Sequence, residues 1–226
     1  MSDNDLSVFG SSPPPRKEDV LFRGDEAWTT NACIAHWDAD WAYSRGFRRA
    51  AERLASHVCE TGTDQDVLIY PIIYLYRHHV ELVLKAVIKS ASGLLDRELT
   101  KQDLKTLNCH SLLELWQTAR PLLDPVCDRA SNPPFPVAEL EGMESYIRQI
   151  NDHDPDGQSF RYTTRKARGG NRSGPRTPSL SPQLKLVNVQ VFAAAMEKLA
   201  AYLEGIEGWF VSLEDAKAEM RRAHDG

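Results

Sequence analysis

The sequence predicts an all-α protein, a single helical bundle with a disordered N-terminus and a long basic loop before its last long helix. Apolar residues recur at helical spacing in several segments, and no segment shows the alternation of apolar and polar residues that is typical of a strand. A hydrophobic fraction of 42% in 226 residues is enough to form one buried core. These observations favour a helical bundle over any sheet architecture.

The N-terminal part of the chain divides into a tail and the first helix. Residues 1–19 contain three consecutive prolines and few apolar side chains, so we expect them to be disordered. The single helical domain is expected over residues 20–213. Its first helix is expected over residues 26–59, where apolar residues follow a period of about 3.6, and the stretch 60–64 is expected to break it.

The strongest helical pattern lies in residues 66–93. Apolar residues there follow the i, i+3, i+4, i+7 rule, and a second apolar line runs beside them, which predicts a central helix buried on nearly every side. A polar strip interrupts the apolar surface. It could be an exposed ladder of ion pairs, or it could line a cleft or a small-ligand site. Its members are Arg77, His78, Glu81, Lys85 and Lys89.

The remaining elements follow from periodicity and from breaking residues. A break at Asn108 separates a short helix from a longer one that carries Trp116. The expected order after it is a loop at 124–136, a helix at 137–150, an irregular stretch at 151–182 whose part 160–182 is a flexible basic loop, a long helix from Leu184, and a charged, fraying helical tail at 214–226.

Composition and motifs limit the classes of function. A net charge of −5 argues against binding nucleic acid through bulk charge. Four cysteines without a CxxC pair and no signal-peptide pattern predict free thiols in a cytoplasmic protein. No apolar run is long enough to span a bilayer, so no membrane association is expected. Phosphate-binding glycine loops, HExxH and metal-ligand spacings are absent from the sequence, so no metal and no cofactor are expected.

One stretch departs from the acidic character of the chain. Residues 160–176 carry six cationic side chains and no acidic one, and Phe160 and Tyr162 add aromatic faces. Such a composition suits binding to an RNA backbone, and the alternative is a solubilising insertion. The candidate RNA-binding residues are Arg161, Arg165, Lys166, Arg168, Arg172 and Arg176.

Three segments together resemble HEPN domains, the helical bundles of prokaryotic toxins, defence systems and RNA-processing enzymes. They are YLYRHHVELVLKAVI, NCHSLLELW and DPDGQSFRY, which begin at Tyr74, Asn108 and Asp154. The resemblance covers roughly residues 66–203. It implies RNA as a ligand, a homodimer, and a partner protein from a defence or toxin–antitoxin system.

Catalytic HEPN domains carry an Arg-x4-6-His motif and cut RNA without a metal. Arg148 and His153 are the pair that fits here. The resemblance then implies that Arg148 stabilises phosphate charge and that His153 acts as the acid or base. On a continuous helix the two positions are about 140° apart, so convergence requires the helix to end between them, as NDHDPDG indicates. The alternative is a helix-end arginine and a solvated loop histidine.

The resulting expectation is a HEPN-like RNA-binding protein and metal-independent endoribonuclease of a toxin, defence or stress system. The alternative is a non-catalytic HEPN-like module that dimerises or binds a partner. These readings differ in whether the chain cleaves RNA.

Overall fold

The computed structural model divides the chain into two compact units, Met1–Trp37 and Asp38–Gly226. In the first unit a short 3₁₀ helix, η2, spans Trp28–Thr30. Of the tail predicted to be disordered, residues 1–14 and 19 lie outside the described residues. The structure describes residues 15–18, 20–22, 24, 26, 28–34, 39–166 and 176–225.

The second unit is a bundle of α-helices, which confirms the predicted fold class. Two three-residue strands form an antiparallel hairpin that pairs Thr164 with Pro178. In chain order the elements are α1 (Ala39–Thr61), α2 (Gln65–Leu94), α3 (Lys101–Leu107), α4 (Leu112–Arg129), α5 (Val137–His153), β1 (Thr164–Lys166), β2 (Arg176–Pro178) and α6 (Val189–Asp225).

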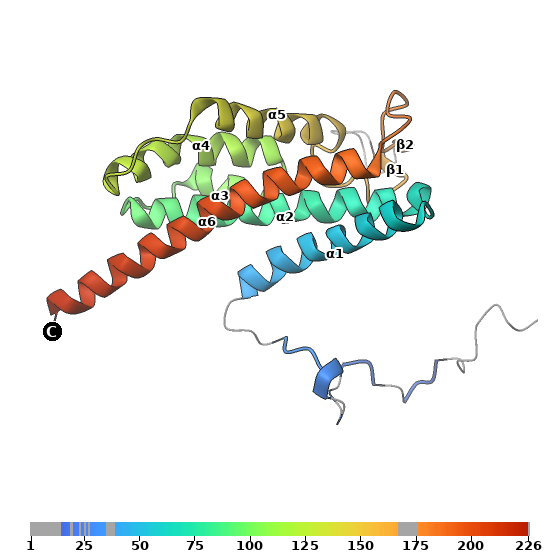
Figure 1. Ribbon diagram of the computed structural model, residues 1–226, viewed down its shortest axis with the longest axis horizontal. Coiled ribbons are helices and arrows are strands. Elements are labelled where there is room, and N and C mark those ends of the chain that lie inside the picture. The colour runs from blue at the N-terminus through green and yellow to red at the C-terminus, as the bar shows by residue number, and fades with distance from the viewer. Residues whose placement is uncertain are drawn as a thin grey trace, which may run out of the picture. The chain divides into compact units, whose positions relative to one another are not determined.

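Helix α2 is the centre of the bundle. It packs against α1, α4 and α6, and α5 covers α4 and reaches α6 (Figure 1). Its fully buried side chains include Ile72, Val80 and Leu84, and Trp116 of α4 and Phe210 of α6 complete the same core. The periodicity of this segment therefore predicted its position correctly, because a helix that is apolar on most sides must be surrounded by others.

Local capping fixes the start of the two helices that follow α2. The Thr100 side chain accepts a hydrogen bond from the Asp103 amide while the Asp103 carboxylate accepts from the Thr100 amide, a reciprocal capping box at the start of α3. After the break at Asn108, the Ser111 hydroxyl accepts a hydrogen bond from the Glu114 amide and begins α4.

Several predicted boundaries are wrong. Helix α1 begins at Ala39 rather than at residue 26, and α6 begins at Val189 rather than Leu184. The charged tail is helical as expected, because α6 continues to Asp225. The irregular stretch 151–182 contains the two strands. Residues 124–129 of the predicted loop belong to α4 despite Pro125, because burial of neighbouring Leu123 and Val126 outweighs the lost backbone donor.

A partly buried polar cluster connects α1, α2 and α6. Glu204 of α6 forms ion pairs with Arg45 (2.5 Å) and Arg48 of α1, and Arg48 also binds Glu197 at 2.5 Å. His79 of α2 is fully buried beside this cluster, with Nδ1 2.9 Å from the Ser44 carbonyl and Nε2 3.5 Å from Glu204. These ion pairs connect α1 directly to α6.

Acid should destabilise the bundle through His79. Burial lowers the pKa of His79 from 6.5 to about 4, although the hydrogen bond from its ring to the Ser44 carbonyl opposes this shift. Because the folded pKa lies below the unfolded one, the neutral ring stabilises the fold above pH 6.5, and this contribution is lost as the pH falls towards 4. At pH 5 the loss is about 2 kcal/mol.

Chemical denaturation at pH 7.5 and pH 5 measures this effect. In His79→Gln the fall in unfolding free energy between the two pH values should be smaller than in the wild type by about that amount. His57→Gln is the control, because the side chain of His57 is 46% exposed at the end of α1. Equal pH dependence in the wild type and in His79→Gln would contradict the prediction.

Candidate functional site

The polar strip on α2 is largely buried. Arg77 and Glu81 are 1% and 2% exposed, so the expectation of an exposed ion-pair ladder is wrong for these two residues. Lys85 follows one turn later, and its side chain is 18% exposed. Spacing of four residues places the three side chains on one face of the helix, and the strip therefore runs from the core to the surface.

Arg77 connects three separate segments. Its Nε lies 3.0 Å from Asp154 Oδ2 in the loop after α5, and its Nη1 donates to Glu81 Oε2 at 3.0 Å. Its Nη2 donates to the backbone carbonyl of His110, just before α4. A buried guanidinium is stable when its donors are satisfied in this way, so Arg77 is a structural centre of the site.

The loop after α5 is shaped to fit against Arg77. The Asp154 carboxylate accepts a hydrogen bond from the Ser159 amide at 2.8 Å, which closes the loop on itself. Gly157 has a φ of 74°, and a Cβ at this position would lie 2.9 Å from Arg77 Nη1. Glycine is therefore required both by the backbone conformation and by the close approach of the guanidinium.

One oxygen of Glu81 accepts hydrogen bonds from two side chains. Its Oε1 accepts hydrogen bonds from Lys85 Nζ and from His110 Nδ1, each at 2.8 Å. Burial opposes the ionisation of Glu81, but the hydrogen bonds from Lys85 and His110 outweigh it and lower the pKa of this carboxyl. The buried group is thus a carboxylate at neutral pH.

The His110 ring extends from this buried carboxylate to the surface. Its side chain is 59% exposed, while its carboxylate partner is 2% exposed. The hydrogen bond at Nδ1 fixes the ring, so Nε2 is the nitrogen available to accept or donate a proton. A carboxylate that orients an exposed imidazole is an arrangement suited to general acid–base catalysis.

An aromatic and cationic row continues along α2 from this point. The His78 ring stacks on Tyr74 with centroids 5.8 Å apart, and Arg161 lies over Tyr74, 5.4 Å from its centroid. Arg161 also lies 5.3 Å from the Tyr162 ring. Burial lowers the pKa of His78, and the charges of Arg77 and Lys85 lower it further, which favours a neutral stacking ring over a charged one.

Three of the predicted RNA-binding side chains are described. Arg161 and Arg176 are exposed, and Arg165, whose side chain is 39% exposed, lies 4.0 Å from Asp156. The hairpin places Arg165 and Arg176 on adjacent strands. For Lys166 only the backbone is described, and Arg168 and Arg172 lie outside the described residues.

Arg148 and His153 both lie on α5. The expectation that the helix ends between them is wrong, because α5 continues through His153, which leaves the two positions about 140° apart around its axis. Arg148 pairs with Glu144 at 2.5 Å, whereas His153 lines a hollow of about 400 Å³ with Phe160 and Phe192. Their assignment as a catalytic pair stays a prediction.

Sequence reasoning missed three residues of the site. His110, Asp154 and Gly157 were not recognised as residues that lie around Arg77 and Glu81. His110 and the loop from Asp154 both lie in segments that were compared with HEPN domains on sequence alone, and that comparison was one signal for them.

The wider searches identify no relative of the chain. No family model matches it, and no match was found among curated proteins or among solved structures. Within the described residues, no group of His, Cys, Asp and Glu side chains could hold a metal ion. No described helix has the combination of length and apolar character needed to cross a membrane.

Proposed function

We propose that the chain is a HEPN-like RNA-binding protein that cleaves single-stranded RNA without a metal, with His110 as its acid–base group. The observation that carries the proposal is the buried Glu81 carboxylate bound to both His110 and Lys85. Maintaining a carboxylate in the interior is costly unless it is well paired. Here it orients a ring whose side chain is 59% exposed.

The chemistry follows from these groups. His110 Nε2 removes the proton from a ribose 2′-hydroxyl, and the 2′ oxygen forms a bond to the adjacent phosphorus. The bond to the 5′ oxygen breaks, and this leaving oxygen takes a proton from water. The products are a 2′,3′-cyclic phosphate and a 5′-hydroxyl end, and Lys85 contributes positive charge beside the phosphate.

The row of aromatic and cationic side chains supports a single-stranded substrate. Tyr70 and Tyr162 are 46% and 49% exposed, and together with Arg161 they line a hollow of about 440 Å³. Nucleobases of a single strand stack on such faces, and arginines contact its phosphates. Tyr74, under Arg161, is seven residues from Glu81, about 10 Å along the helix axis. A short strand of RNA can therefore reach both regions.

The proposed biological setting is a toxin, defence or stress system, with a homodimer as the working form, as the resemblance to HEPN domains implies. A partner protein from such a system would then control the activity.

The purified chain should cleave single-stranded RNA in the presence of EDTA. A labelled oligonucleotide resolved on a denaturing gel detects the cleavage, and mass spectrometry should identify the 2′,3′-cyclic phosphate. Double-stranded RNA of the same sequence should be cut more slowly, because its bases are not free to stack on tyrosine. Binding of RNA without cleavage would contradict the nuclease proposal and favour the alternative of a non-catalytic module.

A further inference from the structure

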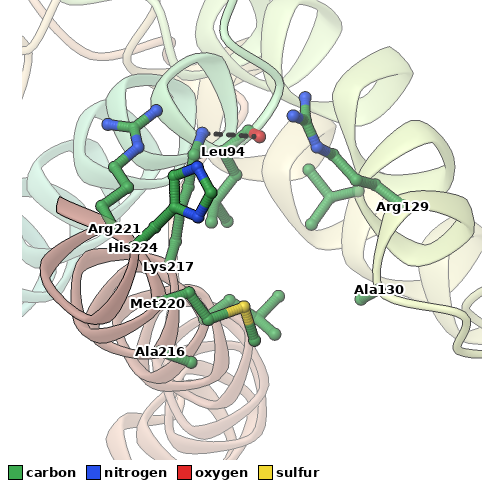
Figure 2. Close-up of a pocket in the computed structure, with 10 residues that line it drawn as sticks. Leu94, Arg129, Ala130, Ala216, Lys217, Met220, Arg221 and His224 are labelled. Atoms are coloured by element: carbon green, nitrogen blue, oxygen red, sulfur yellow. Dashed lines mark hydrogen bonds between the residues drawn. The ribbon is translucent and has the colours of Figure 1, made fainter.

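A second site lies at the opposite end of α2 from the hairpin. The groove has a volume of about 590 Å³ and lies between the C-terminal ends of α2 and α4 and the last turns of α6. Figure 2 shows Lys217, Met220, Arg221 and His224 of α6 facing Arg129, the last residue of α4, and the following Ala130. Its size falls within the range of sites that bind small molecules.

The groove is apolar inside and cationic at its edge. Leu94, Val126, Leu213 and Met220 supply the apolar lining. Met220 is 72% exposed, so its side chain is open to an apolar ligand that enters the groove. The basic lining residues are Arg129, Lys217, Arg221 and His224, and none of the described residues that line the groove is acidic.

One carboxylate beside the groove shows how these cations bind an anion. Asp96 accepts hydrogen bonds from Lys217 at 2.6 Å, from Arg221 at 3.2 Å and from Arg129. These hydrogen bonds lower the pKa of Asp96. Within this group of four side chains, three cations face one carboxylate.

Stabilisation of the C-terminal end of α6 does not explain all of the cationic side chains at the groove. Basic side chains in the last turn of α6 interact favourably with its helix dipole, which explains Arg222 and His224. Arg129, however, belongs to α4 and lies across the groove from α6. Cations therefore border the groove on both sides.

We propose that this groove binds an amphiphile with a single alkyl chain and a carboxylate head. The alkyl chain lies against Leu94, Val126 and Met220, and the carboxylate accepts hydrogen bonds from Arg221 and Arg129. Each guanidinium uses one Nη2 for Asp96 and has further donors for a second anion. A carboxylate suits these donors because they already bind the carboxylate of Asp96.

Dodecanoate is the probe, and isothermal titration calorimetry on the full chain below the critical micelle concentration is the measurement. Saturable binding with one site per chain is expected. Arg221→Glu should weaken it by about tenfold or more, because a charge-assisted hydrogen bond is lost and a like charge is added. Met220→Asp should weaken it similarly by removing apolar lining.

Arg222→Glu is the matched control, since it makes the same change of charge on the adjacent residue, which is not part of the lining. It should leave the affinity within about twofold, given that surface charges separated by solvent interact weakly. Circular dichroism checks that each variant keeps its helical content. The absence of saturable binding, or equal losses in Arg221→Glu and Arg222→Glu, would overturn the proposal. Dodecanol binding as tightly as dodecanoate would also overturn it.

Discussion

Replacing Arg77 with methionine should lower the free energy of unfolding by about 3–5 kcal/mol, which is the usual cost of removing one partner from a buried ion pair. Methionine keeps most of the apolar volume but none of the donors. Asp154, which is fully buried, would lose its ion-pair partner, and Glu81 would lose one of its three hydrogen-bonded partners. The His110 carbonyl would also lose a donor.

Urea denaturation measures the loss, and Arg148→Met is its matched control. Arg148 pairs with a glutamate four residues away, as Arg77 does, but its side chain is 52% exposed, so its removal should cost less than about 1 kcal/mol. Asp154→Asn introduced into Arg77→Met should restore part of the stability, because it removes the unpaired buried charge. If both arginine variants lowered the free energy of unfolding by a similar small amount, the prediction would be wrong, because the buried ion pairs of Arg77 would contribute little to stability.

Periodicity predicted the helices well but their ends less well. The burial of α2 was predictable from its sequence, because a helix that packs against several neighbours must carry apolar residues on several sides. The position at which a helix ends depends on contacts with residues that are distant in the sequence. Proline at 125 indicates a loop by its chemistry, yet α4 continues because Leu123 and Val126 are buried against the rest of the bundle. The two strands are three residues long, too short for any alternation to be visible.

The site was less predictable because its residues are far apart in the chain. The strip on α2 was visible, since Arg77 and Glu81 are one turn apart. Their other partners, His110 and Asp154, lie 29 residues from Glu81 and 77 from Arg77. Spacing carries no information on such contacts. An arginine on a mostly apolar helix is nevertheless informative, because burial of the helix requires a distant carboxylate to pair with it.

If His110 is the acid–base group, His110→Ala should reduce RNA cleavage in EDTA by about a hundredfold or more, which is the effect expected for loss of a positioned proton-transfer group. The substitution should leave the fold intact. Arg77 binds the backbone carbonyl of residue 110, which alanine retains, and Ser111 still caps α4. Lys85 still pairs with Glu81, so the buried carboxylate of Glu81 keeps a cationic partner. RNA binding, measured by fluorescence anisotropy, should change little.

His153→Ala and His57→Ala separate this assignment from its competitors. His153 tests the pairing with Arg148 on α5, and His57, at the end of α1, pairs with Asp64, which is not part of the site. Both variants should cleave within about threefold of the wild type. Loss of cleavage in His153→Ala with retention in His110→Ala would instead place the chemistry at α5. That result would require Arg148 and His153 to meet by a rearrangement of a helix that is continuous through both, or across two copies of the chain.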